Sequence, residues 1–377
     1  MREILQAPTY VDFDVTFRCN LKCEFCSSNA IYDNGNFPAI TEQKENSELS
    51  LEEIDKIFSD FEYLGVFRVS IGGGEPFLRR DILDIIKLAD KYSFSTIINT
   101  NAMLINDKIA SELEKSKIDQ IAISLDSCDS AIHNKMRGVS DAFDKALRGL
   151  KTMLKYNINI TALLTLTSYN IDSVIPTLSF YKEIGLKNAT IMLLCPTGRA
   201  KTNYTRVMYS YEKWKKLLLK LTEMKEKREL PVNLTIVPVN EGSIPWEIFL
   251  PLKEEGIEEK YKLWVQNREV INDDSYSCLA GINAASLAAN GDIYGCDLMV
   301  AEKELCAGNI REESFEFIWN NAEIFKKLRN LKISENEGYC KICEIEGCGG
   351  GCRMSAFFLS NSITGADLRC ELAKRNL

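Results

Sequence analysis

The alternation of two kinds of segment constrains the fold of this chain more than any other feature. From residue 10 to about residue 194, short runs rich in β-branched residues alternate with segments whose apolar residues recur at helical spacing. The strand-like runs span 11–17, 66–71, 95–100, 120–125, 159–166 and 189–194, and the helical segments span 51–63, 81–91, 107–115, 142–156 and 174–184. Six such units predict a parallel α/β sheet with helices outside it, either an open doubly wound sheet or a partial barrel.

Three further segments add to this pattern. Residues 201–228 are helix-prone, and residues 232–239 form one more strand candidate. Residues 36–48 form a polar insertion that we expect at the mouth of the fold, either as a solvated loop or as a substrate contact. Ser50 and Glu53 predict a capping box at the first helix, because each side chain can bond to the backbone amide of the other.

Three cysteines directly follow the first strand-like run. Cys19, Cys23 and Cys26 form a Cys-x3-Cys-x2-Cys array. Three thiolates on one loop can converge on a metal centre and leave one coordination position open. A structural zinc site normally closes with four protein ligands, whereas a cubane iron-sulfur cluster held by three cysteines keeps one iron free for an exogenous ligand. From the triplet alone, a zinc knuckle and buried unliganded thiols stay open as alternatives.

This spacing, with aromatic Phe25 before the last cysteine, resembles the signature of the radical S-adenosylmethionine (SAM) enzymes. In that family the open iron chelates the amino and carboxylate groups of SAM, and reductive cleavage yields a 5′-deoxyadenosyl radical. The resemblance implies a partial (β/α)6 TIM-like barrel, a [4Fe-4S] cluster on the three cysteines and SAM beside Phe25. β/α barrels place their chemistry at the carboxyl ends of the strands, where this loop stands.

A glycine-rich turn, residues 72–76, follows the second strand-like run. Its glycines let the backbone approach a ligand closely, and Glu75 can accept hydrogen bonds from an ammonium group. A plain turn is the alternative. Because it stands one β/α unit after the cysteines, the turn resembles the Gly-Gly-Glu-Pro motif of the family, which implies that Gly73, Gly74, Glu75 and Pro76 grip the SAM amino group.

Short polar residues end the next strands. Asn99 and Asn101 end the third and Ser124 the fourth, where each would face a ligand in a barrel; strand-end capping is the alternative for the two asparagines. Residues 133–138 resemble a His-x3-Arg-Gly element of one branch of the family. That resemblance implies that Ser124 and Arg137 hold the SAM ribose and carboxylate, and the planar fork of arginine suits a carboxylate.

The sixth strand-like run ends in residues 195–200, Cys-Pro-Thr-Gly-Arg-Ala, which resemble a segment of the same branch that lies beside SAM. We interpret Cys195 itself as a packing residue. The one histidine, His133, lies outside any strand end, so we expect it to be structural. Zinc and non-haem iron sites usually use several imidazoles, whereas this chain has thirteen cysteines and one histidine.

Composition narrows the alternatives further. A length of 377 residues fits two domains. The net charge of −8 argues against the basic field of a nucleic-acid-binding protein. The chain begins without the apolar stretch of a secretory signal and has no membrane-spanning apolar segment. We therefore predict a cytoplasmic protein that binds neither nucleic acid nor membrane, in which so many cysteines indicate metal rather than disulfides.

A second set of cysteines lies near the end of the chain. Its members are Cys278, Cys296, Cys340, Cys343, Cys348, Cys352 and Cys370. Asn290-Gly291 between two alternating runs predicts a hairpin that brings Cys296 back toward Cys278. Glycines among the later cysteines let the backbone wrap a cluster and direct amides at its sulfurs. A zinc ribbon is disfavoured, because two Cys-x2-Cys pairs at ribbon spacing are missing.

The order of these seven cysteines resembles the SPASM domain, an auxiliary-cluster module of many peptide-modifying radical SAM enzymes. That resemblance implies two auxiliary iron-sulfur clusters, one held by Cys278, Cys296 and Cys352, the other by Cys340, Cys343, Cys348 and Cys370. The gap after Cys343 is four residues where the family usually has five. The first auxiliary cluster lacks an obvious fourth thiol, because Ala284 stands where some members carry one. Cys306, a non-cysteine ligand or the substrate could fill this position. For Cys306, however, burial is the simpler role.

Together these features predict a radical SAM barrel over residues 1–240, a linker over 241–275 and a SPASM domain over 276–377. The resemblance implies a maturase that abstracts hydrogen from a peptide or protein, with oxidative cross-linking through a thioether or carbon-carbon bond of a ribosomally made precursor peptide. An epimerase or a sulfatase-maturase-like oxidase, cofactor or small-molecule biosynthesis, and a non-enzymatic electron carrier are the alternatives. No residue stands out as a general base.

The resemblance also implies partners. The substrate is a precursor peptide or protein, and the first electron comes from a low-potential donor such as flavodoxin or ferredoxin. Many such maturases carry a leader-binding domain before the barrel, whereas the first strand-like run here begins at about Val11. We therefore expect a leader to be recognised by another surface or by a separate leader-binding protein.

Overall fold

The computed structural model describes residues 5–28, 30–33, 48–237, 244–265 and 274–376. Residues 36–47 of the predicted polar insertion lie outside this part of the chain. Within it, ten strands form one sheet, in the order β12-β11-β10-β1-β4-β5-β6-β7-β8-β9. A second, two-stranded sheet pairs β2 (Arg18–Cys19) with β3 (Ile31–Tyr32).

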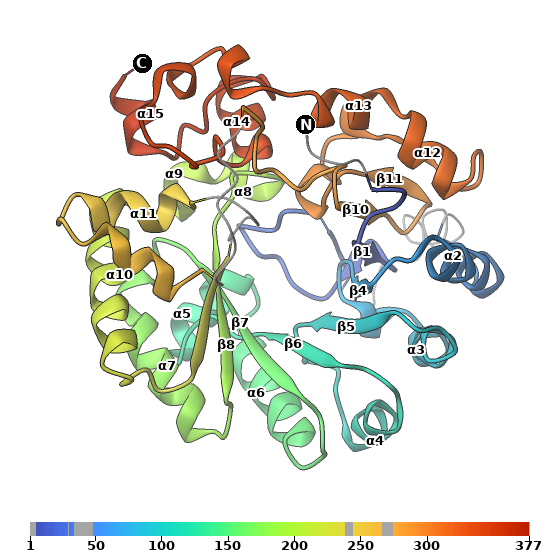
Figure 1. Ribbon diagram of the computed structural model, residues 1–377. Helices are drawn as coiled ribbons and strands as arrows, with labels where there is room; N and C mark the ends of the chain where they lie inside the picture. The colour runs from blue at the N-terminus through green and yellow to red at the C-terminus, as the bar shows by residue number, and fades with distance from the viewer. Residues whose placement is uncertain (1–4, 29, 34–47, 238–243, 266–273, 377) are drawn as a thin grey trace.

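Seven strands of the large sheet run parallel to one another. They are β1 (Tyr10–Asp14), β4 (Arg68–Gly72), β5 (Ser95–Thr100), β6 (Gln120–Ser124), β7 (Ile160–Leu166), β8 (Asn188–Leu193) and β9 (Asn233–Val237). The first six are the predicted strands, and β9 is the further candidate. The strands form an arc with helices on its outer side, so the prediction of a partial α/β barrel is confirmed (Figure 1).

Helices alternate with these strands. The five predicted ones are α2 (Leu51–Leu64), α3 (Ile82–Ala89), α4 (Asp107–Lys115), α6 (Ala142–Met153) and α7 (Val174–Glu183). The structure adds α5 (Ser130–Arg137) after β6, and it divides the helix-prone stretch into α8 (Arg199–Thr202), α9 (Tyr204–Val207) and α10 (Tyr211–Glu226). At α2 the predicted capping box is confirmed: the Ser50 hydroxyl accepts from the Glu53 amide at 3.2 Å, and the Ser50 amide donates to the Glu53 carboxylate at 2.8 Å.

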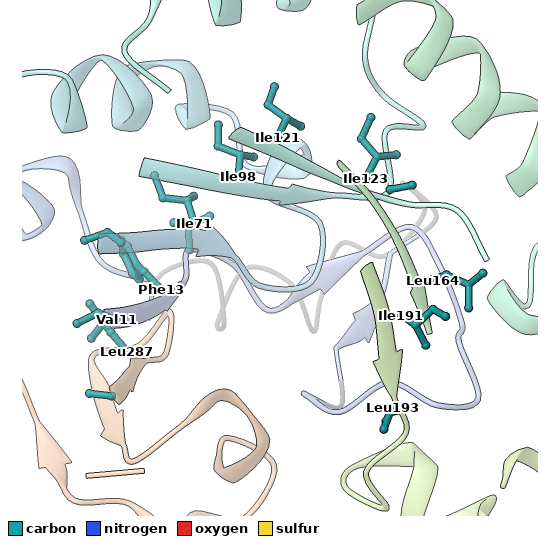
Figure 2. Packing of buried hydrophobic residues seen from close by; sticks show 14 of the residues in the cluster. Val11, Phe13, Ile71, Ile98, Ile121, Ile123, Leu164, Ile191, Leu193 and Leu287 are labelled. Atoms are coloured by element: carbon teal, nitrogen blue, oxygen red, sulfur yellow. The ribbon is translucent and has the colours of Figure 1, made fainter. Parts of the chain in front are cut away.

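The outer side of the strand arc holds the apolar core. Val11 and Phe13 of β1, Ile98 of β5 and Ile191 of β8 are fully buried, and their side chains point outward toward the helices (Figure 2). Because side chains alternate along a strand, the intervening residues of β1 face the concave side. These include Asp12, so the concave side carries polar groups where the outer side is apolar.

The C-terminal part of the chain continues the same sheet. Strand β10 (Ala284–Leu287) pairs in parallel with β1, and β11 (Asp292–Tyr294) returns antiparallel to β10 and pairs with β12 (Gly308–Asn309). The predicted hairpin is therefore present, and it is hydrogen-bonded to the first barrel strand. Two further contacts cross this junction: the Trp319 indole donates to the Leu5 carbonyl at 2.9 Å, and the Arg311 guanidinium pairs with Glu53 at 2.6 Å.

Part of the predicted linker is helical and packed. Residues 244–265 contain α11 (Trp246–Lys253) and the 3-10 helix η3 (Glu258–Leu263). Both lie against α10, where the Trp214 indole donates to the Glu247 carbonyl at 2.6 Å and the Trp264 indole donates to the Thr222 hydroxyl at 2.9 Å. The division of the chain into a barrel, a linker and a C-terminal domain stays a prediction.

The remaining helices belong to the C-terminal part. They are η4 (Asp297–Met299), η5 (Lys303–Leu305), α12 (Phe315–Asn321), α13 (Glu323–Arg329), η6 (Ile333–Glu335), η7 (Tyr339–Ile342), α14 (Arg353–Ser360) and α15 (Glu371–Arg375). They lie along the side that the strand arc leaves open (Figure 1). Among the described residues, no helix is long and apolar enough to cross a membrane.

We expect Phe13→Ala to lower the free energy of unfolding by about 3–5 kcal/mol, because it leaves a cavity in the core between β1 and α2. Phe13 is fully buried and packs edge-on against Phe58 of α2. The matched control is Phe67→Ala, at a side chain that is 65% exposed, which should change stability by about 0.5 kcal/mol or less. Urea unfolding followed by circular dichroism measures both, and equal effects would contradict this packing.

Candidate active site and its cysteine clusters

The loop with the first three cysteines lies at the carboxyl end of β1 and is bonded to the Gly-Gly-Glu-Pro turn. The Gly74 amide donates to the Thr16 carbonyl at 2.8 Å, and the Glu75 amide donates to the Arg18 carbonyl at 2.7 Å. These two bonds continue the pairing of β1 with β4 past the ends of both strands. The cysteine loop and the glycine turn therefore form one rigid unit.

Three glycines allow other segments to approach the cysteine loop this closely. A Cβ atom at Gly74 would stand 2.0 Å from the carbonyl oxygen of Arg18, and one at Gly198 would stand 2.4 Å from that of Ser27. One at Gly138, after α5, would stand 2.8 Å from the Lys22 carbonyl. No side chain fits at such distances, so each glycine is required by backbone packing against the loop.

The segment after β8 also binds the loop through hydrogen bonds to its carbonyl groups. Arg199 donates from its amide to Cys26 at 2.9 Å and from its guanidinium to Cys23 at 2.8 Å. The Asn203 side chain donates to the Glu24 carbonyl at 3.0 Å. These donors come from the segment that was predicted to lie beside SAM, and they fix the path of the loop between its cysteines.

Arg137 brings a positive charge to the first cysteine set. Its guanidinium forms a bidentate pair with buried Asp126, at 2.6 and 2.9 Å, and its third nitrogen lies 3.7 Å from the Cys23 sulfur. The guanidinium also lies 5.1 Å from the centre of the Phe25 ring. Burial raises the pKa of the Cys23 thiol, and Arg137 acts in the opposite direction. Arg137, Phe25 and Cys23, predicted separately, are thus brought together.

Glu75 is buried, and both of its carboxylate oxygens accept hydrogen bonds from the protein. One oxygen accepts from the Thr100 hydroxyl at 2.7 Å and from the Phe77 amide at 3.2 Å; the other accepts from the Asn101 amide at 2.8 Å. Burial raises the pKa of Glu75 to about 7, and these bonds oppose that rise. Glu75 therefore ties the turn to the end of β5, and its predicted contact with the SAM amino group stays a prediction.

The other predicted cofactor contacts lie on the same side of the strands. The Asn99 amide donates to the Ser70 hydroxyl of β4 at 2.7 Å, and the Asn101 side chain donates to Asn20 of the cysteine loop at 2.7 Å. Ser124 is the last residue of β6 and is half-buried. Their contacts with SAM stay predictions.

His133 has the structural role that we expected. It lies in α5, and its Nδ1 atom accepts from the Asp126 amide at 3.2 Å. Burial lowers the pKa of His133 to about 4, which keeps it neutral as an acceptor. It thereby supports the acid that pairs with Arg137.

The later cysteines fall into two groups, according to which thiols affect the pKa of which others. Burial, then the charge of Asp297 and of the thiols of Cys278 and Cys352, raises the pKa of Cys296. In the second group, burial followed by the thiols of Cys370, Cys340 and Cys343 raises the pKa of Cys348. The two groups correspond to the two predicted ligand sets, whose assignment to clusters stays a prediction.

Two features of the site were missed by sequence reasoning. Cys195, interpreted as a packing residue, lies with its sulfur 3.9 Å from that of Cys352. Half-buried Asp12 and Asp14 and exposed Asp297 form an acidic group, in which desolvation followed by the charge of Asp297 raises the pKa of Asp14 to about 7. The period-two pattern of β1 carried a signal for the first two acids, because they stand on its polar face. The contact of Cys195 had no local signal.

Within the described ranges, no three His, Cys, Asp or Glu side chains converge closely enough to hold a single metal ion. A cubane cluster has iron atoms at several of its corners, and each protein ligand binds a different iron. Its ligands therefore lie farther apart than the ligands of a single metal ion. The donors available are buried and half-buried thiols, which lose their protons when they bind metal. Their chemistry fits iron-sulfur clusters, for which thiolates are the usual ligands.

Comparison with known families identifies both parts of the chain. Residues 13–181 match the radical SAM superfamily, and residues 278–348 match SPASM, an iron-sulfur cluster-binding domain. The protein is a radical SAM enzyme with a SPASM domain. Its cofactors are the radical SAM [4Fe-4S] cluster, SAM and auxiliary iron-sulfur clusters, as predicted.

Similar proteins span nearly the whole chain. An AdoMet-dependent heme synthase of Methanosarcina barkeri is 26% identical over 357 residues, which is 95% of this chain and 94% of the relative. The mycofactocin maturase MftC of Mycolicibacterium smegmatis is 23% identical over 97% of this chain and 83% of its own length. Radical SAM/SPASM relatives therefore include proteins with different named activities.

Solved structures support the fold. Streptococcus suis SuiB bound to S-adenosylmethionine has a TM-score of 0.74 at 21% identity, over 98% of this chain and 78% of SuiB. SuiB bound to its precursor peptide SuiA has a TM-score of 0.72 at 21% identity, over 98% and 77% of the two chains. The anSMEcpe structure with bound AdoMet has a TM-score of 0.69 at 19% identity, over 97% and 94%.

We expect Gly74→Ala to remove about one cubane, or about four irons per chain, because the added Cβ would displace the Arg18 carbonyl and with it the cysteine loop. The matched control is Gly65→Ala, at the end of α2, where a Cβ meets no atom within 4 Å. The control costs some stability, because Gly65 has a φ of 77°, but it should keep its iron. Iron and sulfide assays after anaerobic reconstitution measure both variants; full iron in Gly74→Ala would contradict the proposed packing role.

Proposed function

We propose that this enzyme takes a hydrogen atom from a peptide or protein substrate and completes an oxidative cross-link in it, forming a thioether or a carbon-carbon bond in a ribosomally made precursor peptide. The cofactors supply the radical chemistry and the route for electrons. Hydrogen loss followed by bond formation removes two electrons from the substrate, and the second electron needs an acceptor. Auxiliary clusters are suitable acceptors.

One observation carries this proposal: a single short segment touches both cysteine systems. Arg199 binds the carbonyls of Cys23 and Cys26, and four residues earlier Cys195 lies 3.9 Å from Cys352. The site of radical generation and the electron-accepting site therefore both contact the segment after β8. This arrangement suits an oxidation that proceeds in two one-electron steps. A simple electron carrier has no need for an open iron beside the glycine turn.

The proposal assigns each predicted residue a role. Cys19, Cys23 and Cys26 hold the radical SAM cluster, and the seven later cysteines hold two auxiliary clusters in the sets given above. Gly73, Gly74, Glu75 and Pro76 surround the SAM amino group, and Arg137 faces its carboxylate. Phe25, Asn99 and Ser124 complete the SAM site.

The chain's own groups shape the substrate chamber in this proposal. The concave side of β1 presents Tyr10 and Asp12, whose side chains are joined by a hydrogen bond of 2.6 Å. Burial first, and then the neighbouring Asp297, raises the pKa of Asp12. Such polar groups can position a peptide backbone, while the surrounding barrel excludes water from the radical.

The peptide class is supported by relatives rather than by the site alone. SuiB has been solved with a precursor peptide, and MftC is named a maturase. The heme synthase relative favours a second candidate, a role in cofactor biosynthesis. A short open reading frame beside the gene would favour the peptide, and a set of biosynthetic genes would favour the second candidate.

In both cases a low-potential donor such as flavodoxin or ferredoxin supplies the first electron. A separate protein that binds the leader is part of the peptide proposal.

The test is anaerobic incubation of the reconstituted enzyme with SAM, dithionite and the peptide encoded beside its gene. Mass spectrometry should find the peptide lighter by two hydrogens, because a cross-link removes one hydrogen from each joined position. An unchanged mass with an inverted residue would replace cross-linking by epimerisation, and formation of heme from a porphyrin precursor with no change in any peptide would contradict the proposal. A variant with Cys19, Cys23 and Cys26 changed to Ala is the control and should leave the peptide unchanged.

A further inference from the structure

Cys195 stands at the point where the barrel meets the C-terminal part of the chain. It follows β8 by two residues, at the carboxyl end of that strand. Its own carbonyl accepts from the Thr197 amide at 2.8 Å, and the preceding Leu194 carbonyl accepts from the Arg369 guanidinium at 3.1 Å. The backbone on both sides of Cys195 is therefore fixed, and its sulfur is held 3.9 Å from that of Cys352.

Cys352 belongs to the auxiliary set that lacks a fourth thiol. It precedes α14, and its amide donates to the Asp367 carboxylate at 3.1 Å. Besides burial, the charge of Cys352 raises the pKa of both Cys278 and Cys296, so the three thiols lie near one another. Cys195 lies 157 residues away in sequence from Cys352, and its sulfur is 3.9 Å from the sulfur of this member of the set.

We propose that Cys195 is the fourth thiolate ligand of the first auxiliary cluster, together with Cys278, Cys296 and Cys352. This inference rests on the ligand sets proposed above. Binding to iron converts the Cys195 thiol into a thiolate and releases its proton, with no change in oxidation state.

The other two positions considered for a fourth ligand have different contacts. The Cys306 sulfur donates to the backbone carbonyl of Gly308 at 3.4 Å, and it also has a hydrogen bond with the side chain of Tyr294 in β11. It therefore lies with β11 and β12. Ala284 has no donor atom in its side chain, and it pairs with Tyr10 in the sheet.

Buried Arg369 links the end of β8 to the residues around Cys352. It donates to the Leu194 carbonyl at 3.1 Å, to Asp367 at 2.7 Å and to Glu247 at 3.2 Å. Asp367 in turn accepts from the Cys352 amide at 3.1 Å. The same guanidinium therefore positions the backbone next to both Cys195 and Cys352.

Full ligation by protein thiolates gives this cluster a defined role. An iron with four sulfur ligands has no position for substrate, so the cluster acts as an electron acceptor rather than as a binding site for a substrate thiol. The ligand also ties the end of β8 to the C-terminal part of the chain. Because Gly198 and Arg199 of the same segment contact the first cysteine loop, the two cluster sites become parts of one rigid frame.

The test uses the full chain with Cys19, Cys23 and Cys26 changed to Ala, so that the open iron of the radical SAM cluster is absent and only auxiliary clusters contribute. After anaerobic reconstitution and reduction, addition of cyanide should leave the electron paramagnetic resonance (EPR) spectrum unchanged, because no auxiliary iron is open. A shift caused by cyanide would overturn the proposal, and this measurement needs no change at Cys195.

Cys195→Ala is then added to this background. We expect either the loss of about one iron per chain, with the EPR signal of an oxidised [3Fe-4S] cluster, or a spectrum that cyanide now shifts. The matched control, Cys306→Ala, should behave like the background. A Cys195→Ala spectrum identical to the background, before and after cyanide, would overturn the proposal.

A further variant separates this inference from the assignments beneath it. In the same background, Cys278→Ala should also lose iron, because Cys278 is a ligand of the same predicted cluster. If Cys278→Ala keeps all of its iron, the predicted ligand set is wrong, and the inference that rests on it is overturned. The mass change of the peptide is measured independently with the unmodified enzyme, so failure of the proposed reaction would be recognised separately.

Discussion

The close approach of the glycine turn to the cysteine loop is the constraint on which the rest of the site depends. Gly74 and Glu75 donate to the carbonyls of Thr16 and Arg18, and a side chain at Gly74 would occupy the position of the Arg18 oxygen. The loop is therefore positioned by backbone contacts rather than by its own cysteines. The three thiols of the loop can then be presented to a cluster in a fixed arrangement, because contacts around the ligands orient them, as in other metal sites.

The same loop also connects the two halves of the molecule. On one side Arg137, paired with Asp126, approaches Cys23; on the other, Arg199 binds the loop carbonyls from the segment after β8. That segment contains Cys195, which reaches Cys352. The sheet itself continues from β1 into β10, so barrel and C-terminal part share backbone hydrogen bonds as well as facing cysteines.

Local patterns predicted the local features of this fold, because hydrophobic period and caps act within one segment. The six strands, the capping box of Ser50 and Glu53, and the hairpin at Asn290 follow from such patterns. The contact of Cys195 with Cys352 and the extension of the sheet by β10 bring together residues far apart in sequence, which no local period encodes. The helical part of the linker was obscured by Pro251, which lies inside α11.

We propose that Cys19, Cys23 and Cys26 hold a cluster with one iron open to SAM. Its most direct test is the release of 5′-deoxyadenosine when the reconstituted enzyme receives dithionite and SAM without substrate. We expect release by the unmodified chain and none by a variant that has the three cysteines changed to Ala and keeps its auxiliary clusters. No release by the unmodified chain, or equal release by the variant, would contradict it.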